Sequence, residues 1–356
     1  MSTAISSKPL HTMGKRLLSR WFFYGYVGGH VRHVCGPKVV VRSQTDCIVL
    51  SVIKDCEEYI TTFIDYYLAQ GFTHIVLMDN GSTDRTLELA SQYGQEGQVT
   101  ILQCLLPFGQ YKRHMCNYMA HRFSTHRWCL LADCDEFFDY PGSECVTLSQ
   151  LVQYLNQQNA TAVLVQMLDM YPQTAIGPQQ ASRNFRTTHR WFEVNTLEPQ
   201  IIPTGLQNQL PSEDLHLNYG GVRQRIFDAS PLLSKFSLIK PDRYLHLVGL
   251  HLVSWAKVAD ISCVVYHYKF LAGFSQRVTH AIRQGQYYQG AAEYKQYQAK
   301  LSDEAGITLW TQESIALAGP QQLIDLDLLT VSERYRSYCS AAASAPPSAT
   351  SLTKAP

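Results

Sequence analysis

The sequence of 356 residues predicts an α/β fold, with a mostly parallel central sheet and helices on both of its faces. Apolar, β-branched runs of strand length alternate with stretches of helical spacing over the first half of the chain. Acidic residues lie within two positions of the end of three of the four runs. Ligands of parallel sheets bind beyond the carboxyl ends of the strands, so these acids lie where a site is expected.

The expected elements follow one another between Asp46 and Ala132. Strands are expected over 46–53, 72–78, 99–104 and 128–132, and helices over 57–70, 83–93 and 111–123. Gly71 marks the end of the first helix, because glycine readily adopts the left-handed conformation of a helix C-terminus. The β-α-β-α order predicts parallel neighbours joined by crossover helices.

Composition excludes several classes of protein. The formal net charge of +1 gives no bulk attraction to nucleic acid, so a nucleic-acid partner is not expected. Ten cysteines are present, but none forms a Cys-x-x-Cys pair and most lie in apolar runs. They are typical of small buried side chains in a reducing compartment, which indicates a cytoplasmic protein.

The two ends of the chain differ from its middle. Residues 1–45 are expected to be an irregular leader, and the low-complexity residues 339–356 a disordered tail. Lys15, Arg16 and Arg20 precede the aromatic segment 21–27, which is too short to span a bilayer. That order is typical of a segment lying on the anionic inner face of a membrane; a segment packed on the protein core is the alternative.

Two acids at the end of the fourth run are the strongest chemical signal. In a strand, residues two apart project to the same face, so Asp133 and Asp135 are expected to converge. Converging carboxylates repel each other unless a cation lies between them, and few oxygen ligands suit Mg²⁺ or Mn²⁺ completed by substrate phosphates. A solvated strand end or a helix N-cap is the alternative for an isolated pair.

Two further acidic turns are expected at the same edge of the sheet. The turn at 54–57 follows the first strand, and the turn at 79–84 follows the second. One acidic turn is routine at a strand end. Three on one edge favour a common site.

These residues resemble the family 2-like glycosyltransferases with the GT-A fold. The resemblance rests on Val52-Ile-Lys-Asp-Cys-Glu-Glu-Tyr-Ile60, on Met78-Asp-Asn-Gly-Ser-Thr-Asp-Arg-Thr86 and on an Asp-x-Asp-Glu-Phe motif that begins at Asp133. It implies a glycosyltransferase domain over 46–270, with a nucleotide-binding half (46–140) and an acceptor half (141–270). A helical C-terminal extension is expected over 271–338.

The resemblance also implies roles for the residues of the nucleotide-binding half. Asp79 would contact the base or ribose, Val52 and Lys54 would line the uracil, and Asp133 would face the ribose and the metal. Asp135 would be the main ligand of Mn²⁺ or Mg²⁺.

Three further implications concern the donor site. An Arg/Asn pair that borders the donor sugar in the family would correspond to Arg113 and Asn117, which lie four apart on one helix face. The family usually has Asn-Glu where this chain has Asp55-Cys56. Glu57 would supply that acid through a shift in the turn.

Catalysis must be completed by the second half. Inverting transfer needs a base, and family members use an Asp downstream of the metal motif, often preceded by Glu. Asp214, in a Glu-Asp pair, is the leading candidate and Glu193 the alternative. His267 fits the place of a late-strand histidine that completes the metal shell in many enzymes of this fold.

The sequence therefore predicts a metal-dependent glycosyltransferase that moves a sugar from a UDP-linked donor, with inversion, to a glycan or lipid-linked acceptor. Two alternatives stay open. A nucleotidyltransferase would carry a Gly-rich or basic loop where residues 55–58 stand. A non-catalytic nucleotide-sugar-binding relative would keep the Asp79 turn without a working base.

Overall fold

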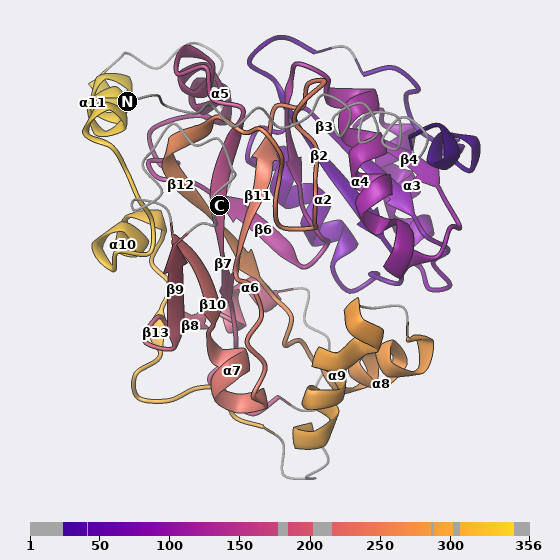
Figure 1. The fold of residues 1–356 in the computed structure, drawn as a ribbon, viewed down its shortest axis with the longest axis vertical. Helices are drawn as coiled ribbons and strands as arrows, with labels where there is room; N and C mark the ends of the chain where they lie inside the picture. Colours follow the sequence, from indigo (N-terminus) through magenta and orange to yellow (C-terminus); the bar gives the residue numbers. More distant parts are fainter. Residues whose placement is uncertain are drawn as a thin grey trace, which may run out of the picture.

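The computed structural model describes residues 24–344 except 41, 177–183, 202–215, 286–287 and 302–306 (Figure 1). A nine-stranded sheet forms its centre, in the order β1-β4-β3-β2-β5-β11-β7-β12-β6. The strands are β1 (Arg32–Cys35), β2 (Cys47–Ile53), β3 (His74–Asp79), β4 (Val99–Gln103), β5 (Trp128–Leu131), β6 (Glu136–Asp139), β7 (Ala162–Asp169), β11 (Ser234–Ile239) and β12 (Val258–His267). The α/β class expected from the sequence is confirmed.

Six of the nine strands point the same way, so the sheet is mostly parallel. β2, β3, β4 and β5 are parallel neighbours, and β7 pairs with β12 in parallel. β11 runs antiparallel between β5 and β7 and thereby joins the two halves of the chain into one sheet. β1 and β6 are antiparallel edge strands.

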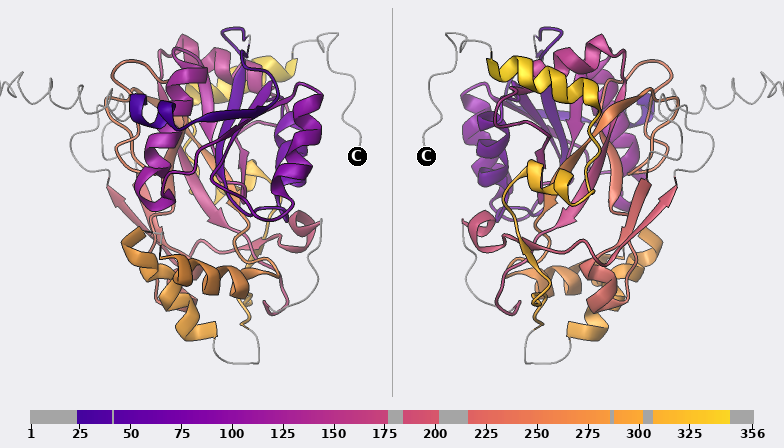
Figure 2. Two further views of the ribbon diagram at one scale, coloured as in Figure 1. Left: turned by 90° about the vertical axis from the view of Figure 1, so that its right-hand side faces the viewer. Right: turned by 90° about the vertical axis from the view of Figure 1, so that its left-hand side faces the viewer.

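Helices cover both faces of the sheet (Figure 2). On one face, α2 (Ile60–Ala69), α3 (Thr86–Gln95), α5 (Leu148–Gln157), α10 (Pro320–Asp325) and α11 (Glu333–Ser344) contribute to one apolar core. On the other face, α4 (Phe108–Ser124) packs with the connection between β11 and β12. Alternate residues of β2 supply the two cores: Val49 faces the first, and Ile48 and Leu50 face the second.

The remaining elements gather at the lower end of Figure 1. They are α6 (Phe185–Thr188), β8 (Trp191–Phe192), β9 (Leu197–Ile201), β10 (His216–Gly220), α7 (Val222–Phe227), α8 (Phe274–Gln284), α9 (Tyr288–Leu301) and β13 (Ile315–Ala316). β9 pairs with β10 and β8 with β13 in two small antiparallel sheets. A third apolar core joins α7 to α8 and α9.

Two expectations about the ends of the chain are wrong in part. The leader is not irregular throughout, because residues 32–35 form β1 and pair with β4. The tail is helical up to Ser344, since α11 continues through Cys339, which packs against the first core. The rest of the expected tail, and residues 1–23 of the leader, lie outside the described residues. Within the described ranges, no helix has the length and apolar character needed to cross a bilayer.

Candidate functional site

The three acidic turns lie at one edge of the sheet, as the sequence predicts. β2, β3 and β5 are parallel neighbours, with Ile53 opposite Asp79 and Leu50 opposite Leu131. Their carboxyl ends therefore meet: Lys54 follows β2 directly, Asp79 is the last residue of β3, and Asp133 comes two residues after the end of β5.

Asp79 organises its own turn. The side chain is fully buried, and its carboxylate accepts hydrogen bonds from the backbone N–H groups of Gly81 (3.0 Å) and Ser82 (2.9 Å) and from Gln103 Nε2 (3.0 Å). Gly81 has a φ of 81°, a conformation that favours glycine. Asp79 thus fixes the backbone of the loop at the expected nucleotide position.

Asp55 and Glu57 tie the first turn to the second. Asp55 Oδ1 accepts from the backbone N–H of Thr83 at 2.6 Å, and Glu57 Oε2 accepts from that of Arg85 at 3.0 Å. The intervening Cys56 is buried, with its N–H donated to Thr86. Both carboxylates therefore brace the loop between β3 and α3. Lys54 and Val52 lie on the β2 side of the same edge.

Asp133 forms an ion pair with α4. Lys112 Nζ lies 2.7 Å from Asp133 Oδ2, and the Asp133 side chain remains 43% exposed. Burial raises the pKa of Asp133, but the ammonium groups of Lys112 and Lys235 outweigh burial and hold this pKa below its usual value. Lys235 itself forms a buried ion pair with Glu136. Two cations thus accompany the acids at this edge.

Strand register brings His267 to Asp135. β12 lies between β6 and β7, with His267 opposite Glu136 on one side and opposite Asp169 on the other. His267 Nε2 is 3.2 Å from Asp135 Oδ2, and Nδ1 is 2.6 Å from Asp169 Oδ1. Burial opposes protonation of the imidazole, but the Asp135 and Asp169 carboxylates raise the pKa of His267 to about 9. Asp135 has a lowered pKa: burial raises it, but the neighbouring His267 outweighs burial.

This arrangement suits a divalent cation. A histidine that ligates a metal normally donates its other ring N–H to a carboxylate, and Asp169 accepts from Nδ1 in that way. Nε2 and the Asp135 carboxylate are then left facing each other as one nitrogen and one oxygen donor. No group of three or more His, Cys, Asp and Glu side chains in the described part of the chain is arranged to hold a metal. Substrate oxygens would have to complete the shell.

Sequence reasoning missed Asp169 and its pairing with Arg223 and His267. Asp169 Oδ2 binds Arg223 Nε of α7 at 2.7 Å, and Arg223 Nη1 binds Glu293 of α9 at 3.0 Å. Asp169 ends the apolar run of β7, so the rule that singled out Asp133 would also have found it. No local signal marks Arg223, which lies 54 residues further along the chain.

Arg113 and Asn117 lie beside the site but hold a loop. Asn117 bonds the backbone of Leu247 in both directions, accepting from its N–H at 2.8 Å and donating to its carbonyl at 3.1 Å. Arg113 Nη1 donates to the carbonyl of Val248 at 2.9 Å.

The two candidates for the base fare differently. Asp214 lies outside the described residues. Glu193 is buried, and its carboxylate accepts from Arg225, from Thr196 at 2.6 Å and from the Tyr171 hydroxyl at 3.4 Å. Glu193 is therefore enclosed by protein donors rather than presented at the acidic edge.

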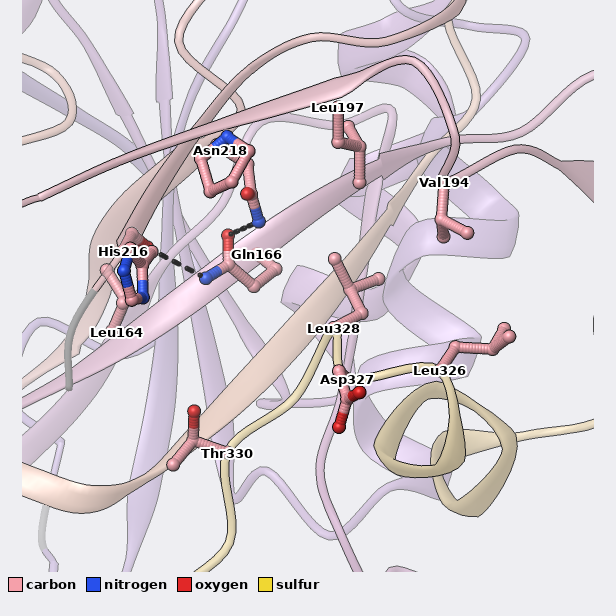
Figure 3. Close-up of a pocket in the computed structure, with 11 residues that line it drawn as sticks. Leu164, Gln166, Val194, Leu197, His216, Asn218, Leu326, Asp327, Leu328 and Thr330 are labelled. Atoms are coloured by element: carbon pink, nitrogen blue, oxygen red, sulfur yellow. Dashed lines mark hydrogen bonds between the residues drawn. The ribbon is translucent and has the colours of Figure 1, made fainter.

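A separate cavity of about 350 Å³ lies between β7, the paired strands β9 and β10 and the stretch after α10 (Figure 3). Its polar groups are largely paired: the Gln166 amide bonds Asn218 at 3.0 Å and the carbonyl of His216 at 3.3 Å. None of the site residues expected from the sequence lines it. The acidic edge is therefore distinct from this cavity.

The α/β sheet with its acidic edge belongs to an enzyme of the glycosyltransferase class, as a family model shows. The chain belongs to glycosyltransferase family 92. The model of this family matches residues 52–249, which are more than half of the chain. The expected class, a glycosyltransferase, is confirmed. The matching family is 92, whereas the sequence motifs resemble family 2-like enzymes. No curated protein matches the chain.

Solved structures of transferases show partial similarity. TarS from S. aureus, residues 1–349 in complex with UDP, has a TM-score of 0.30 and 19% identity, over 37% of this chain and 39% of that one. A mannosyltransferase from Pyrobaculum calidifontis, in complex with GDP-Man and Mn²⁺, has a TM-score of 0.28 and 20% identity, over 42% and 43%. The chain spans less than half the length of these structures.

Proposed function

We propose that this protein is a metal-dependent glycosyltransferase that transfers a sugar, with inversion, from a UDP-linked donor to a hydroxyl of a glycan or lipid-linked acceptor. Membership of family 92 supports the reaction class. The observation that carries the metal dependence is the row Asp135–His267–Asp169. The Asp169 carboxylate fixes the imidazole ring through Nδ1, and the Asp135 carboxylate faces Nε2.

Asp135 and His267 would hold Mn²⁺ or Mg²⁺, with Asp133 turned to the donor. The ion would neutralise the negative charge that develops on the departing diphosphate. Lys112 would add a second positive charge at the same edge, because it is already paired with Asp133. As the donor binds, its phosphates would compete with Asp133 for this ammonium group.

The nucleoside would lie over the turns that follow β2 and β3. Asp55, Glu57 and Asp79 brace this pair of turns, so they would shape the pocket through the backbone. Val52 and Lys54 would line its uracil side, and Arg113 and Asn117 would border the sugar through the loop at Leu247.

The base that removes the acceptor proton would be Asp214, with Glu193 as the second candidate. A base must keep an oxygen within hydrogen-bond reach of the acceptor hydroxyl. Glu193 is surrounded by Arg225, Thr196 and Tyr171, which favours Asp214.

A hydrolysis assay over UDP-, GDP- and dTDP-sugars with Mn²⁺ tests the proposal. Turnover of one donor that requires the metal and is lost in Asp135→Ala is expected. Asp65→Ala provides a control, since Asp65 is an exposed carboxylate on α2 that binds only the Tyr93 hydroxyl among the contacts described. Turnover that survives Asp135→Ala would exclude this metal site. Donor binding without any turnover would favour the non-catalytic alternative.

A further inference from the structure

The connection between β11 and β12 exposes an unusual set of apolar side chains. Tyr244, Val248, Leu250 and Trp255 are 45%, 46%, 46% and 53% exposed. They account for four of the nine exposed large hydrophobic residues in the described part of the chain. Single exposed apolar residues are common, whereas a group within twelve residues indicates a contact surface. We call residues 244–255 the apolar hairpin.

The backbone of the apolar hairpin is ordered by its own hydrogen bonds. Leu247 pairs with Val253, and the N–H of Val248 donates to the carbonyl of Leu252 at 2.9 Å. Leu245, Leu247 and Val253 are buried in the core beside α4. Since the inner positions are filled, Val248 and Leu250 at the tip have no core position to occupy.

The hairpin is also fixed to the body of the protein. Asn117 and Arg113 of α4 bind the backbone at Leu247 and Val248. Asp242 Oδ1 accepts from the N–H groups of Tyr244 (2.6 Å) and Leu245 (2.7 Å) at the base. A rigid apolar tip loses little conformational entropy when it is buried against a partner.

Charge indicates what kind of partner it meets. Residues 240–257 contain three basic residues, Lys240, Arg243 and Lys257, and one acidic residue, Asp242, which gives a net charge of +2. The Arg243 guanidinium lies over the Tyr244 ring, 4.6 Å from its centre. Aromatic and aliphatic tips flanked by basic residues are suited to anionic lipid headgroups.

The described chain begins on the same face of the sheet. Residues 24–29 form a helix whose Val27 belongs to the same apolar core as Leu245, and Figure 2 shows both segments on the side that α4 covers. The Tyr24 and Tyr26 rings contact the Tyr118 and Tyr111 rings of α4. The sequence before Tyr24 carries Lys15, Arg16 and Arg20, followed by the aromatic residues Trp21, Phe22 and Phe23.

We propose that the apolar hairpin docks this face of the protein on an anionic bilayer surface. The hairpin inserts Val248 and Leu250 at the headgroup level, and Arg243 and Lys257, which flank it in the sequence, contact lipid phosphates. Its inner side adjoins the acidic edge, because His251 Nδ1 lies 3.0 Å from the carbonyl of Ser234, next to Lys235. Docking thus holds the candidate site close to the bilayer, which suits a lipid-linked acceptor. That last consequence rests on the proposed function, whereas docking itself does not.

Vesicle sedimentation with the full-length protein tests the docking. The probes are vesicles of phosphatidylcholine with and without phosphatidylglycerol. The protein is expected to sediment with the anionic vesicles, and less as salt rises. Val248→Ser/Leu250→Ser is expected to lower the partition coefficient about tenfold or more, because two apolar side chains no longer enter the interface. Ile201→Ser, at a 59% exposed position of β9, is the matched control and should bind as the unaltered protein does.

A second variant guards against misfolding. Trp255 has a φ of 52°, a conformation that asparagine tolerates, so Trp255→Asn removes an apolar ring without backbone strain. It should weaken vesicle binding at an unchanged melting temperature. Failure of the unaltered protein to bind anionic vesicles would overturn the proposal. Full binding by both hairpin variants, with loss only in Trp21→Ser/Phe22→Ser, would overturn it too and assign the contact to the N-terminal segment.

Discussion

His267 Nδ1 lies 2.6 Å from Asp169 Oδ1, and this contact orients the imidazole toward Asp135. Asp169→Asn keeps the shape of the side chain but removes the charge that fixes the ring. We expect the affinity for Mn²⁺ to fall about 10–100-fold, the range typical of changes behind a metal ligand. Isothermal titration with Mn²⁺ alone measures this directly and needs no donor or acceptor.

Asp260→Asn is the matched control for that substitution. Asp260 is a partly buried carboxylate that accepts from the hydroxyls of Tyr154 (2.8 Å) and Ser332, away from His267. Its replacement should leave the Mn²⁺ affinity unchanged. Equal affinities of the Asp169→Asn variant and the unaltered protein would show that the carboxylate has no part in metal binding.

Arg223 should contribute more to stability than Glu293, although both belong to one ion-pair row. The Arg223 side chain is 5% exposed and binds Asp169, which is 4% exposed, whereas the Glu293 side chain is 36% exposed. Arg223→Met leaves a buried carboxylate with one cation fewer and should lower the free energy of unfolding by about 3–5 kcal/mol. Glu293→Gln should cost about 0–1 kcal/mol, because water can screen the partly exposed pair.

Urea unfolding at pH 7 compares the two variants. A midpoint for Arg223→Met close to that of Glu293→Gln would contradict the difference in burial. The slope of the transition should stay the same in both, since neither change is expected to alter the surface exposed on unfolding.

The nucleotide-binding half could be predicted from the sequence because its signals are local. The apolar runs at 46–53, 72–78, 99–104 and 128–132 correspond to β2, β3, β4 and β5. Gly71, expected to end the first helix, has a φ of 93° immediately after α2. Parallel pairing then places their following turns at one edge, so the acidic site followed from strand order alone.

The rest of the fold depends on pairings that leave no local pattern. β1 carries no clear alternation, and it becomes a strand only because β4 offers an unpaired edge. β11 enters the sheet between β5 and β7, a position that no residue near it indicates. The contact between His267 and Asp169 needs the register of β12 on β7. The sequence could therefore name His267 by resemblance, but it could not show that Asp169 and Arg223 lie beside it.

The candidate bases can be separated by measuring activity and stability together. Asp214→Asn should lower transfer about 10²–10⁴-fold with donor binding and the unfolding midpoint unchanged, as for the loss of a general base. Glu193→Gln should instead lower the free energy of unfolding by about 1–3 kcal/mol, because Arg225 loses a charged partner. A fully stable Glu193→Gln enzyme without transfer activity would reverse the assignment.

His74 should make the fold sensitive to acid. Burial, with a smaller effect of the Arg42 charge, lowers the pKa of His74 to about 4. The Thr100 hydroxyl donates to the carbonyl of Pro37, so His74 Nε2 donates to Thr100 Oγ1 at 2.8 Å. Burial keeps the ring neutral. An unfolded histidine binds its proton near pH 6.5. The stability that neutral His74 allows is therefore fully present above pH 6.5 and is lost as the pH falls toward 4. In this window His74 binds a proton only in the unfolded chain.

At pH 5, His74 lowers the free energy of unfolding by about 2 kcal/mol relative to its value above pH 6.5. His74→Gln retains an N–H donor for Thr100 but does not titrate. The free-energy difference between the unaltered protein and the variant should therefore be about 2 kcal/mol smaller at pH 5 than at pH 7, as measured by urea unfolding at both values. Using the difference cancels the other groups that titrate in this range. An equal difference at the two pH values would mean that His74 is protonated in the folded protein.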